Sequence, residues 1–153
     1  MDESAETGAV SVRNAHGSRS LPVALLTRLA QTGQEVLKIM EARYLDRVKP
    51  PGAVSIVLID DVQIGRVHEK FMGDANPTDV ITFPYGEHGE ILISIDTAER
   101  QASQFKASVD RELALYVVHG ILHLCGYEDE TESGRRGMTE LQEGLLEEVF
   151  EGA

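Results

Sequence analysis

The feature that most restricts the fold is the run Val-Ser-Ile-Val-Leu-Ile at 54–59, which is nearly all apolar and rich in β-branched residues. Such a run is typical of a strand that is buried on both faces of a sheet. A chain of 153 residues has room for one such sheet with its covering helices. We therefore expect a single domain built around this strand.

The other elements are predicted from apolar periodicity and from turn residues. Helices are predicted at 21–44, 61–71, 96–105, 108–125 and 135–150, and further strands at 10–14, 80–83 and 91–95. The last two strands are predicted to pair as a hairpin. Residues 1–9 are expected to be disordered, which leaves 10–153 as the domain. The predicted fold class is α+β, with helices packed on a small mixed sheet of about four strands.

Charge and composition exclude several classes of protein. The net charge of -12 argues against a protein that coats nucleic acid, although residues 10–50, with seven bases and three acids, carry +4. Residues 128–153 hold nine acids and two bases. The single cysteine, Cys125, excludes an internal disulfide and a four-cysteine zinc cluster. No apolar run approaches the roughly 18 residues of a membrane helix, and the acidic N-terminus is no secretory signal, so a soluble cytoplasmic protein is expected.

Two histidines four residues apart provide the strongest chemical signal. His119 and His123 lie in the predicted helix 108–125, where a turn of 3.6 residues separates them by only about 40° around the axis. Both rings can then point at one ion, and Asp129, beyond a reversal at Gly126, offers a third ligand. Three protein ligands leave one position for water, as in catalytic zinc sites. Without a metal, the same pair would be ordinary surface or core histidines.

The string that contains this pair is more specific than the pair itself. Residues 119–127, His-Gly-Ile-Leu-His-Leu-Cys-Gly-Tyr, resemble the signature His-Gly-x-Leu-His-Leu-x-Gly-Tyr-Asp-His of the YbeY family of metal-dependent endoribonucleases. Residues 78–84, Thr-Asp-Val-Ile-Thr-Phe-Pro, resemble its Thr-Asp-Val-Leu-Ser-Phe-Pro strand, and residues 89–94, Gly-Glu-Ile-Leu-Ile-Ser, its Gly-Asp-Ile-x-Ile-Ser strand. The order and spacing of the three stretches also agree, over about 54–138.

The resemblance implies a zincin-like metal helix and a metal-dependent endoribonuclease that prefers single-stranded RNA. It further implies a role in ribosomal RNA maturation and ribosome quality control, with ribosomal RNA and the ribosome or small-subunit proteins as partners. The cofactor expected from it is one zinc ion, held by His119, His123 and Asp129.

The chain departs from the family pattern at three places. Asp129 stands where the family has its third histidine, which lowers the charge of a zinc site from +2 to +1 and makes nickel or manganese easier to accommodate. His68 and Met72 stand where the family has asparagine and a phosphate-stabilising arginine. In the last predicted helix the family's glutamate is out of register, because Glu140 and Glu143 flank Gln142.

Position 120 is glycine, so the chain lacks the glutamate base of His-Glu-x-x-His peptidases. His119 and, in an accessory role, His68 are therefore the candidate catalytic residues. Glu112, seven residues before His119, is expected to orient a ligand ring. Tyr127 is expected to stack on a base. Four further residues are expected to shape the substrate groove or to donate hydrogen bonds to RNA: Thr78, Asp79, Thr82 and Ser94.

Two other functions fit the same residues. One is a metal-dependent hydrolase of another bond, such as an amide or a different phosphoester. The other is a non-catalytic ribosome-biogenesis module whose metal is structural and closed by four protein ligands. The sequence does not indicate the oligomeric state or the position of RNA cleavage.

Overall fold

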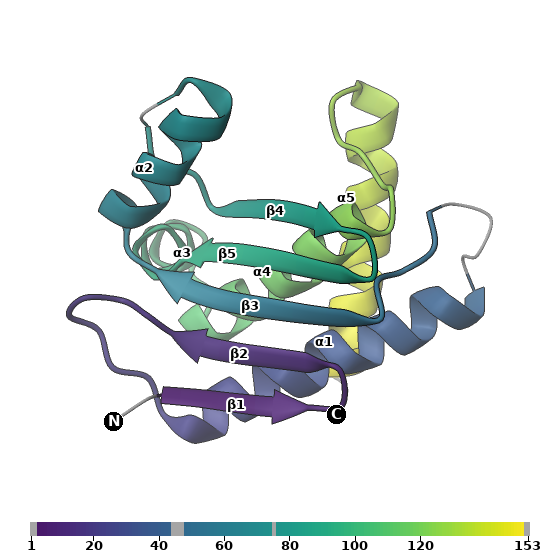
Figure 1. The fold of residues 1–153 in the computed structure, drawn as a ribbon, viewed down its shortest axis with the longest axis horizontal. Coiled ribbons are helices and arrows are strands. Elements are labelled where there is room, and N and C mark those ends of the chain that lie inside the picture. Colours follow the sequence, from purple (N-terminus) through teal and green to yellow (C-terminus); the bar gives the residue numbers. More distant parts are fainter. Residues whose placement is uncertain (1–2, 44–47, 75, 152–153) are drawn as a thin grey trace.

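The computed structural model describes residues 3–43, 48–74 and 76–151. Its five strands form one mixed sheet in the order β1-β2-β3-β5-β4 (Figure 1). The strands are β1 (Glu3–Thr7), β2 (Val10–Asn14), β3 (Ala53–Ile59), β4 (Val80–Tyr85) and β5 (His88–Ser94). The three central strands β2, β3 and β5 are parallel to one another, whereas the edge strands β1 and β4 run antiparallel to them.

The helices agree closely with the predicted ranges. They are α1 (Val23–Arg43), α2 (Asp61–Met72), α3 (Ile95–Gln104), α4 (Val109–Leu124) and α5 (Glu132–Leu146), which continues into a final π-helical turn, η1 (Glu147–Glu151). Among the helices of the described ranges, none has both the length and the apolar character that crossing a bilayer requires.

The N-terminal strand corrects two predictions. The sheet has five strands instead of about four, because Glu3–Thr7, expected to be disordered, forms the edge strand β1. Its polar sequence lacks the apolar alternation that predicts a strand, because an edge strand pairs with only one neighbouring strand and buries only part of one face. The Glu3 carboxylate holds its beginning by accepting hydrogen bonds from Leu21 N–H and the Asn14 amide.

The predicted hairpin is confirmed, and the central strand is less buried than expected. Strands β4 and β5 pair antiparallel, with Ile81 opposite Leu92. In β3, the side chains of Val54, Ile56 and Leu58 are buried, whereas Ser55 and Val57 on the other face are only partly covered. The expectation of a strand buried on both faces is therefore wrong, because the helix layer covers only one face completely.

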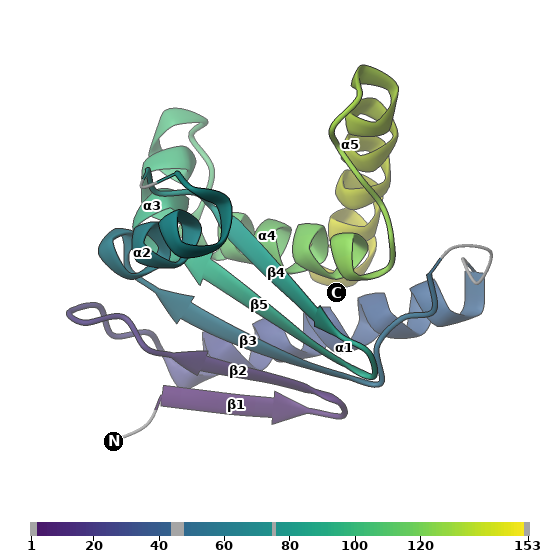
Figure 2. The same ribbon diagram turned by 45° about the horizontal axis from the view of Figure 1, so that its top comes forward.

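The helix layer explains this asymmetry. Helices α1 and α4 lie behind the sheet in Figure 1, and their buried side chains form one core with alternate residues of β2, β3 and β5. On the opposite face, α2 covers a smaller cluster around Ile64, Ile81 and Leu92. Figure 2 shows α5 standing beyond the β4 edge, where it packs on α4. The C-terminal half of α4 thus lies between the sheet and α5.

Candidate metal centre

Helix α4 places the two histidines, and its ends are defined locally. The Ser108 hydroxyl accepts a hydrogen bond from Arg111 N–H at the first turn, which confirms the predicted N-cap. At the other end Gly126 has a φ of +90°, a left-handed conformation that glycine adopts without strain. The chain reverses there, and this reversal brings Asp129 back toward the helix.

The three predicted ligands lie together. The Nε2 atoms of His119 and His123 are 2.9 Å apart, and Asp129 Oδ2 lies 3.6 Å from the first and 3.8 Å from the second. Ligand atoms at about 2.0–2.2 Å from a tetrahedral ion are themselves about 3.3–3.6 Å apart. Of the three measured distances, 2.9 Å lies below this range and 3.6 and 3.8 Å lie at or just above its upper end, so small side-chain shifts bring the donors to the spacing that one small cation needs.

The outer nitrogens of the two rings show which atoms face the ion. His119 Nδ1 lies 2.8 Å from Gln142 Oε1, and His123 Nδ1 lies 3.0 Å from the Tyr127 carbonyl oxygen. Both neighbours are acceptors, so both Nδ1 atoms carry the hydrogen and donate it. Both Nε2 atoms then present lone pairs to each other at 2.9 Å, which is repulsive unless a cation lies between them. These residues fit a divalent metal ion.

Burial favours the neutral form of His123. Desolvation, followed by the nearby His119 ring, lowers the pKa of His123, and this outweighs the opposite effect of Asp129. A neutral imidazole is the form that binds a metal. The site is therefore ready to bind a cation near neutral pH.

The glycine between the ligands allows α4 to approach the sheet. A Cβ atom on Gly120 would lie 2.8 Å from Ile91 Cγ2 and 2.9 Å from Ile91 Cδ1. Gly89 on β5 has the same role from the other side, because its Cβ would lie 2.6 Å from Leu124 Cδ1. The two glycines thus fix the height of the metal helix above the sheet.

The contact expected of Glu112 is made by another residue. Glu112 is buried in α4, and no hydrogen bond within the described ranges joins it to either ring, whereas Gln142 of α5 contacts His119. Sequence reasoning missed Gln142, although it stands at the place where the family's glutamate was expected between Glu140 and Glu143. The shift of the family's glutamate position in the last helix was the one feature of the sequence that could have indicated Gln142.

The predicted substrate residues separate into two groups. Thr78 and Asp79 lie in the loop before β4, where Thr78 is partly buried and Asp79 is exposed. Thr82 lies within β4 and pairs with Ile91, so its side chain is on the face of the sheet that α4 covers. Ser94 is fully buried: its hydroxyl donates to Asp61 Oδ1 and accepts from Thr97 N–H as the N-cap of α3. The contact of Ser94 with RNA stays a prediction, and in this structure its hydroxyl is occupied by the cap of α3.

The other residues singled out in the sequence lie outside the histidine–aspartate cluster. His68 lies on α2, where its Nδ1 is 2.8 Å from the Asn76 carbonyl oxygen, and no hydrogen bond or ion pair within the described ranges joins it to the cluster. Met72, which the sequence pattern predicts to stand in place of the family arginine, is 66% exposed at the end of α2. Tyr127 is partly buried and packs against the core beside the metal helix.

Comparisons with known proteins agree with the geometry. A family model described as "Endoribonuclease YbeY" matches residues 19–150. A protein named Endoribonuclease YbeY from Pelotomaculum thermopropionicum is 34% identical over 149 residues, which are 90% of this chain and 94% of the relative. Another from Thermotoga neapolitana is 37% identical over 124 residues, 77% of this chain and 83% of the relative. The solution structure of TM1509 from Thermotoga maritima aligns with a TM-score of 0.62 at 30% identity, over 92% of this chain and 90% of that one.

Proposed function

The chain belongs to the YbeY family, and from this premise we propose that it is a zinc-dependent endoribonuclease that prefers single-stranded RNA. The observation that carries the proposal is the convergence of His119 Nε2, His123 Nε2 and Asp129 Oδ2, the one such group of three or more possible ligands in the described part of the chain. A divalent cation bound there supplies Lewis-acid chemistry, because it makes water more acidic and neutralises charge on a phosphodiester.

The protein's own contribution is orientation of the ligands and transfer of protons. Gln142 Oε1 and the Tyr127 carbonyl fix both rings with Nε2 inward, so the ligand geometry exists before the ion arrives. His68 is the proposed accessory base: its Nδ1 faces the Asn76 carbonyl, which leaves Nε2 as its proton acceptor. Thr78, Asp79 and Thr82 are proposed to line the path of the RNA, with Tyr127 beside it.

The choice of zinc rests on the donor set. Two imidazoles and one carboxylate suit zinc, and nickel or manganese are the proposed competitors, because a carboxylate is a harder ligand than a third imidazole. Three donors are the number found at catalytic zinc sites, whereas structural sites are closed by four. This count favours an enzyme over a binding module with a structural metal.

The charge of the chain bears on how RNA is brought to the site. With a net charge of -12, the protein gains little from non-specific attraction to phosphates. We therefore propose that the ribosome or small-subunit proteins position the substrate, and that the activity serves ribosomal RNA maturation and ribosome quality control in the cytoplasm. A hydrolase of another bond remains the second candidate, supported by Met72 at the position of the family arginine.

The deciding experiment compares His123→Ala with the matched variant His88→Ala. His88 lies at the exposed start of β5, outside the cluster. Both proteins are loaded with zinc and given a single-stranded ribosomal RNA fragment, its duplex form, and amide and phosphomonoester substrates. We expect the wild type and His88→Ala to cleave the single strand, His123→Ala to lose at least a hundred-fold in rate, and a chelator to abolish cleavage.

The same experiment separates the alternatives. RNA cleavage that survives both His123→Ala and the chelator would overturn the proposal. Hydrolysis of another substrate with RNA left intact would favour the second candidate. In cells, unchanged ribosomal RNA ends in a strain that carries His123→Ala would contradict the proposed role in maturation.

A further inference from the structure

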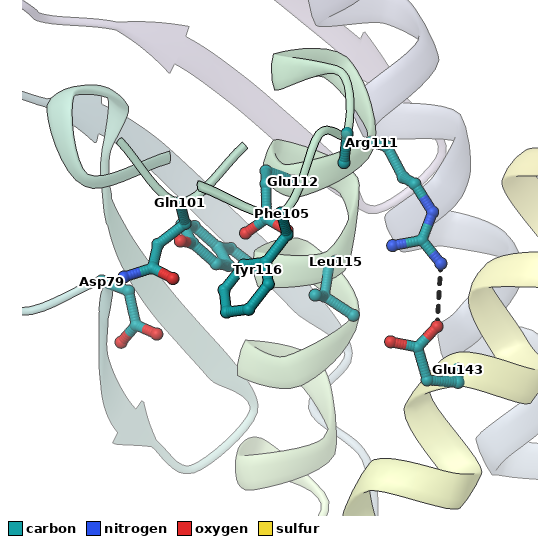
Figure 3. A pocket seen from close by; sticks show the side chains of 9 residues that line it. Asp79, Gln101, Phe105, Arg111, Glu112, Leu115, Tyr116 and Glu143 are labelled. Carbon is teal, nitrogen blue, oxygen red and sulfur yellow. Dashed lines mark hydrogen bonds and ion pairs between the residues drawn. The ribbon is translucent and has the colours of Figure 1, made fainter. Parts of the chain in front are cut away.

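A cavity of about 640 Å³ lies beside the metal centre. It is bounded by α3, the first half of α4, α5 and the residue before β4. Figure 3 shows Asp79, Gln101, Tyr116 and Glu112 on one side of it and the Arg111–Glu143 ion pair on the other. This volume falls within the range of about 300–1,000 Å³ that is usual for small-molecule sites.

Two buried polar groups of α4 line this cavity, and one of them has no hydrogen-bond partner within the described residues. Tyr116 is 5% exposed, and its hydroxyl has no hydrogen-bond partner in the described part of the chain. Glu112, one turn earlier, is 7% exposed. Burial, and then the negative charge of Glu112, raise the pKa of the Tyr116 phenol, yet the two groups do not meet hydrogen-bond geometry. Buried polar groups are nearly always satisfied, so a hydroxyl without a protein partner beside a cavity is available to a ligand or to water.

The cavity lies along the same helix as the first proposed metal ligand. Arg111, Leu115 and His119 are spaced by four residues and form one stripe along α4, so the cavity wall leads to the first metal ligand. On α5, Glu143 of the cavity adjoins Gln142, which contacts His119. A molecule in the cavity is therefore about one helical turn from the cluster.

The lining excludes a phosphate. Asp79 and Glu112 contribute two negative charges, and the one cation of the cavity, Arg111, is already paired with Glu143 and Glu151. A neutral, planar ligand rich in hydrogen-bond donors fits this lining better than an anion. The Phe105 ring, 66% exposed and part of the cavity wall, offers a face for stacking.

We propose that this cavity is a subsite for a guanine base of the RNA, next to the phosphodiester that is cleaved. The proposal rests on the proposed function. Guanine is the base whose Watson–Crick edge presents two neighbouring donors, N1–H and the N2 amino group, which one carboxylate accepts together. Its O6 acceptor then receives the Tyr116 hydroxyl or the Gln101 amide. The other three bases each present a single donor group on that edge, so they satisfy this lining less well.

The test measures nucleoside binding, which needs no metal because nucleosides carry no phosphate. Guanosine, adenosine, cytidine and uridine are titrated separately into the full-length protein, followed by nuclear magnetic resonance. We expect guanosine to bind at least ten-fold more tightly than the others. Tyr116→Phe removes only the orphan hydroxyl, so it should weaken guanosine binding about five-fold, a typical value for one hydrogen bond, without lowering the melting temperature. The matched variant Tyr85→Phe, on an exposed tyrosine of β4, should change neither quantity.

Gln101→Ala, at a half-buried position of α3 outside the hydrophobic core, provides a second variant, and it should also weaken guanosine binding. Mapping of cleavage sites on an RNA of mixed sequence should show a preference for cuts beside guanosine that Tyr116→Phe reduces. Equal affinity for the four nucleosides, or no binding by any of them, overturns the subsite even if RNA is cleaved. Guanosine binding by a protein that cleaves no RNA supports the subsite and overturns the nuclease.

Discussion

At the scale of single residues, the metal centre depends on groups behind the ligands as much as on the ligands. The rings of His119 and His123 are each held from the far side, one by a side chain of α5 and the other by a backbone carbonyl. The backbone contact follows from the turn after α4, but the contact of Gln142 crosses between two helices. Such outer contacts fix the tautomer and the direction of the ring.

The contact of Gln142 leads to the first prediction. Gln142→Ala should weaken metal binding about 10–100-fold, because the His119 ring loses the acceptor that directs its Nε2 inward. Competitive titration against a chromophoric chelator measures this change. Gln104→Ala, an exposed glutamine at the end of α3, serves as the control and should bind metal as the wild type does. Equal affinities in the two variants would show that the contact does not orient the ring.

At the scale of elements, the Asp61 carboxylate is the main polar connection between α2 and α3. Asp61, in the first turn of α2, accepts hydrogen bonds from the Ser94 and Thr97 hydroxyls and from the Arg100 guanidinium. Burial alone would raise the pKa of Asp61, but these donors outweigh it and the pKa is lowered. The ionised form is therefore part of the folded structure.

The pH dependence of stability tests this connection. Because the folded pKa of Asp61 lies below its unfolded value of about 3.9, its contribution is fully present above that value and is lost as the pH falls through the folded pKa. Asp61→Asn should lower the free energy of unfolding by about 1–3 kcal/mol at pH 7 and flatten its decline below pH 4. Urea unfolding at several pH values measures both. Asp110→Asn, an exposed carboxylate of α4, should give a curve parallel to the wild type.

The contact between α4 and β5 gives a second prediction at this scale. Gly120→Ala should destabilise the fold by about 1–3 kcal/mol, because its methyl group would overlap Ile91. Gly137→Ala, in α5 with no atom within 4 Å of the added carbon, should instead stabilise by roughly 0.5–1 kcal/mol. Chemical denaturation distinguishes the two directions. If both variants were stabilised, close approach would not be the reason for glycine at position 120.

At the scale of the whole molecule, an ion at this centre would connect parts of the chain that belong to different elements. The ligands come from α4 and from the loop that leads to α5, and the Gln142 contact extends the connection into α5 itself. An ion that binds only the folded chain stabilises all of these parts together.

Metal binding should therefore raise the stability of the entire domain. At a zinc concentration one hundred times the dissociation constant, the free energy of unfolding should rise by about 2.7 kcal/mol, and a chelator should reverse the gain. Asp129→Ala should lose most of this increase, whereas Glu130→Ala, its exposed neighbour, should retain it. Thermal unfolding with and without zinc measures the difference. A melting temperature that does not change with zinc would contradict the presence of a metal site.

Much of the site was predictable because its geometry is local. The spacing of His119 and His123 places both rings on one side of any helix, and the cap at Ser108 and the reversal at Gly126 set its ends. The hairpin of β4 and β5 could also be predicted, since turn residues and alternating apolar residues lie side by side in the sequence.

What only the tertiary structure decided involves pairs that are distant in sequence. The polar strand β1 is ordered by its pairing with β2, Gln142 takes the place expected of Glu112 because α5 packs across α4, and Ser94 turns inward to cap α3. The cavity around Tyr116 exists because three helices meet beside β4. Local periodicity determines which residues share a face, but only the packing of those faces determines which side chains meet, because contact free energy depends on neighbours that the sequence does not place together.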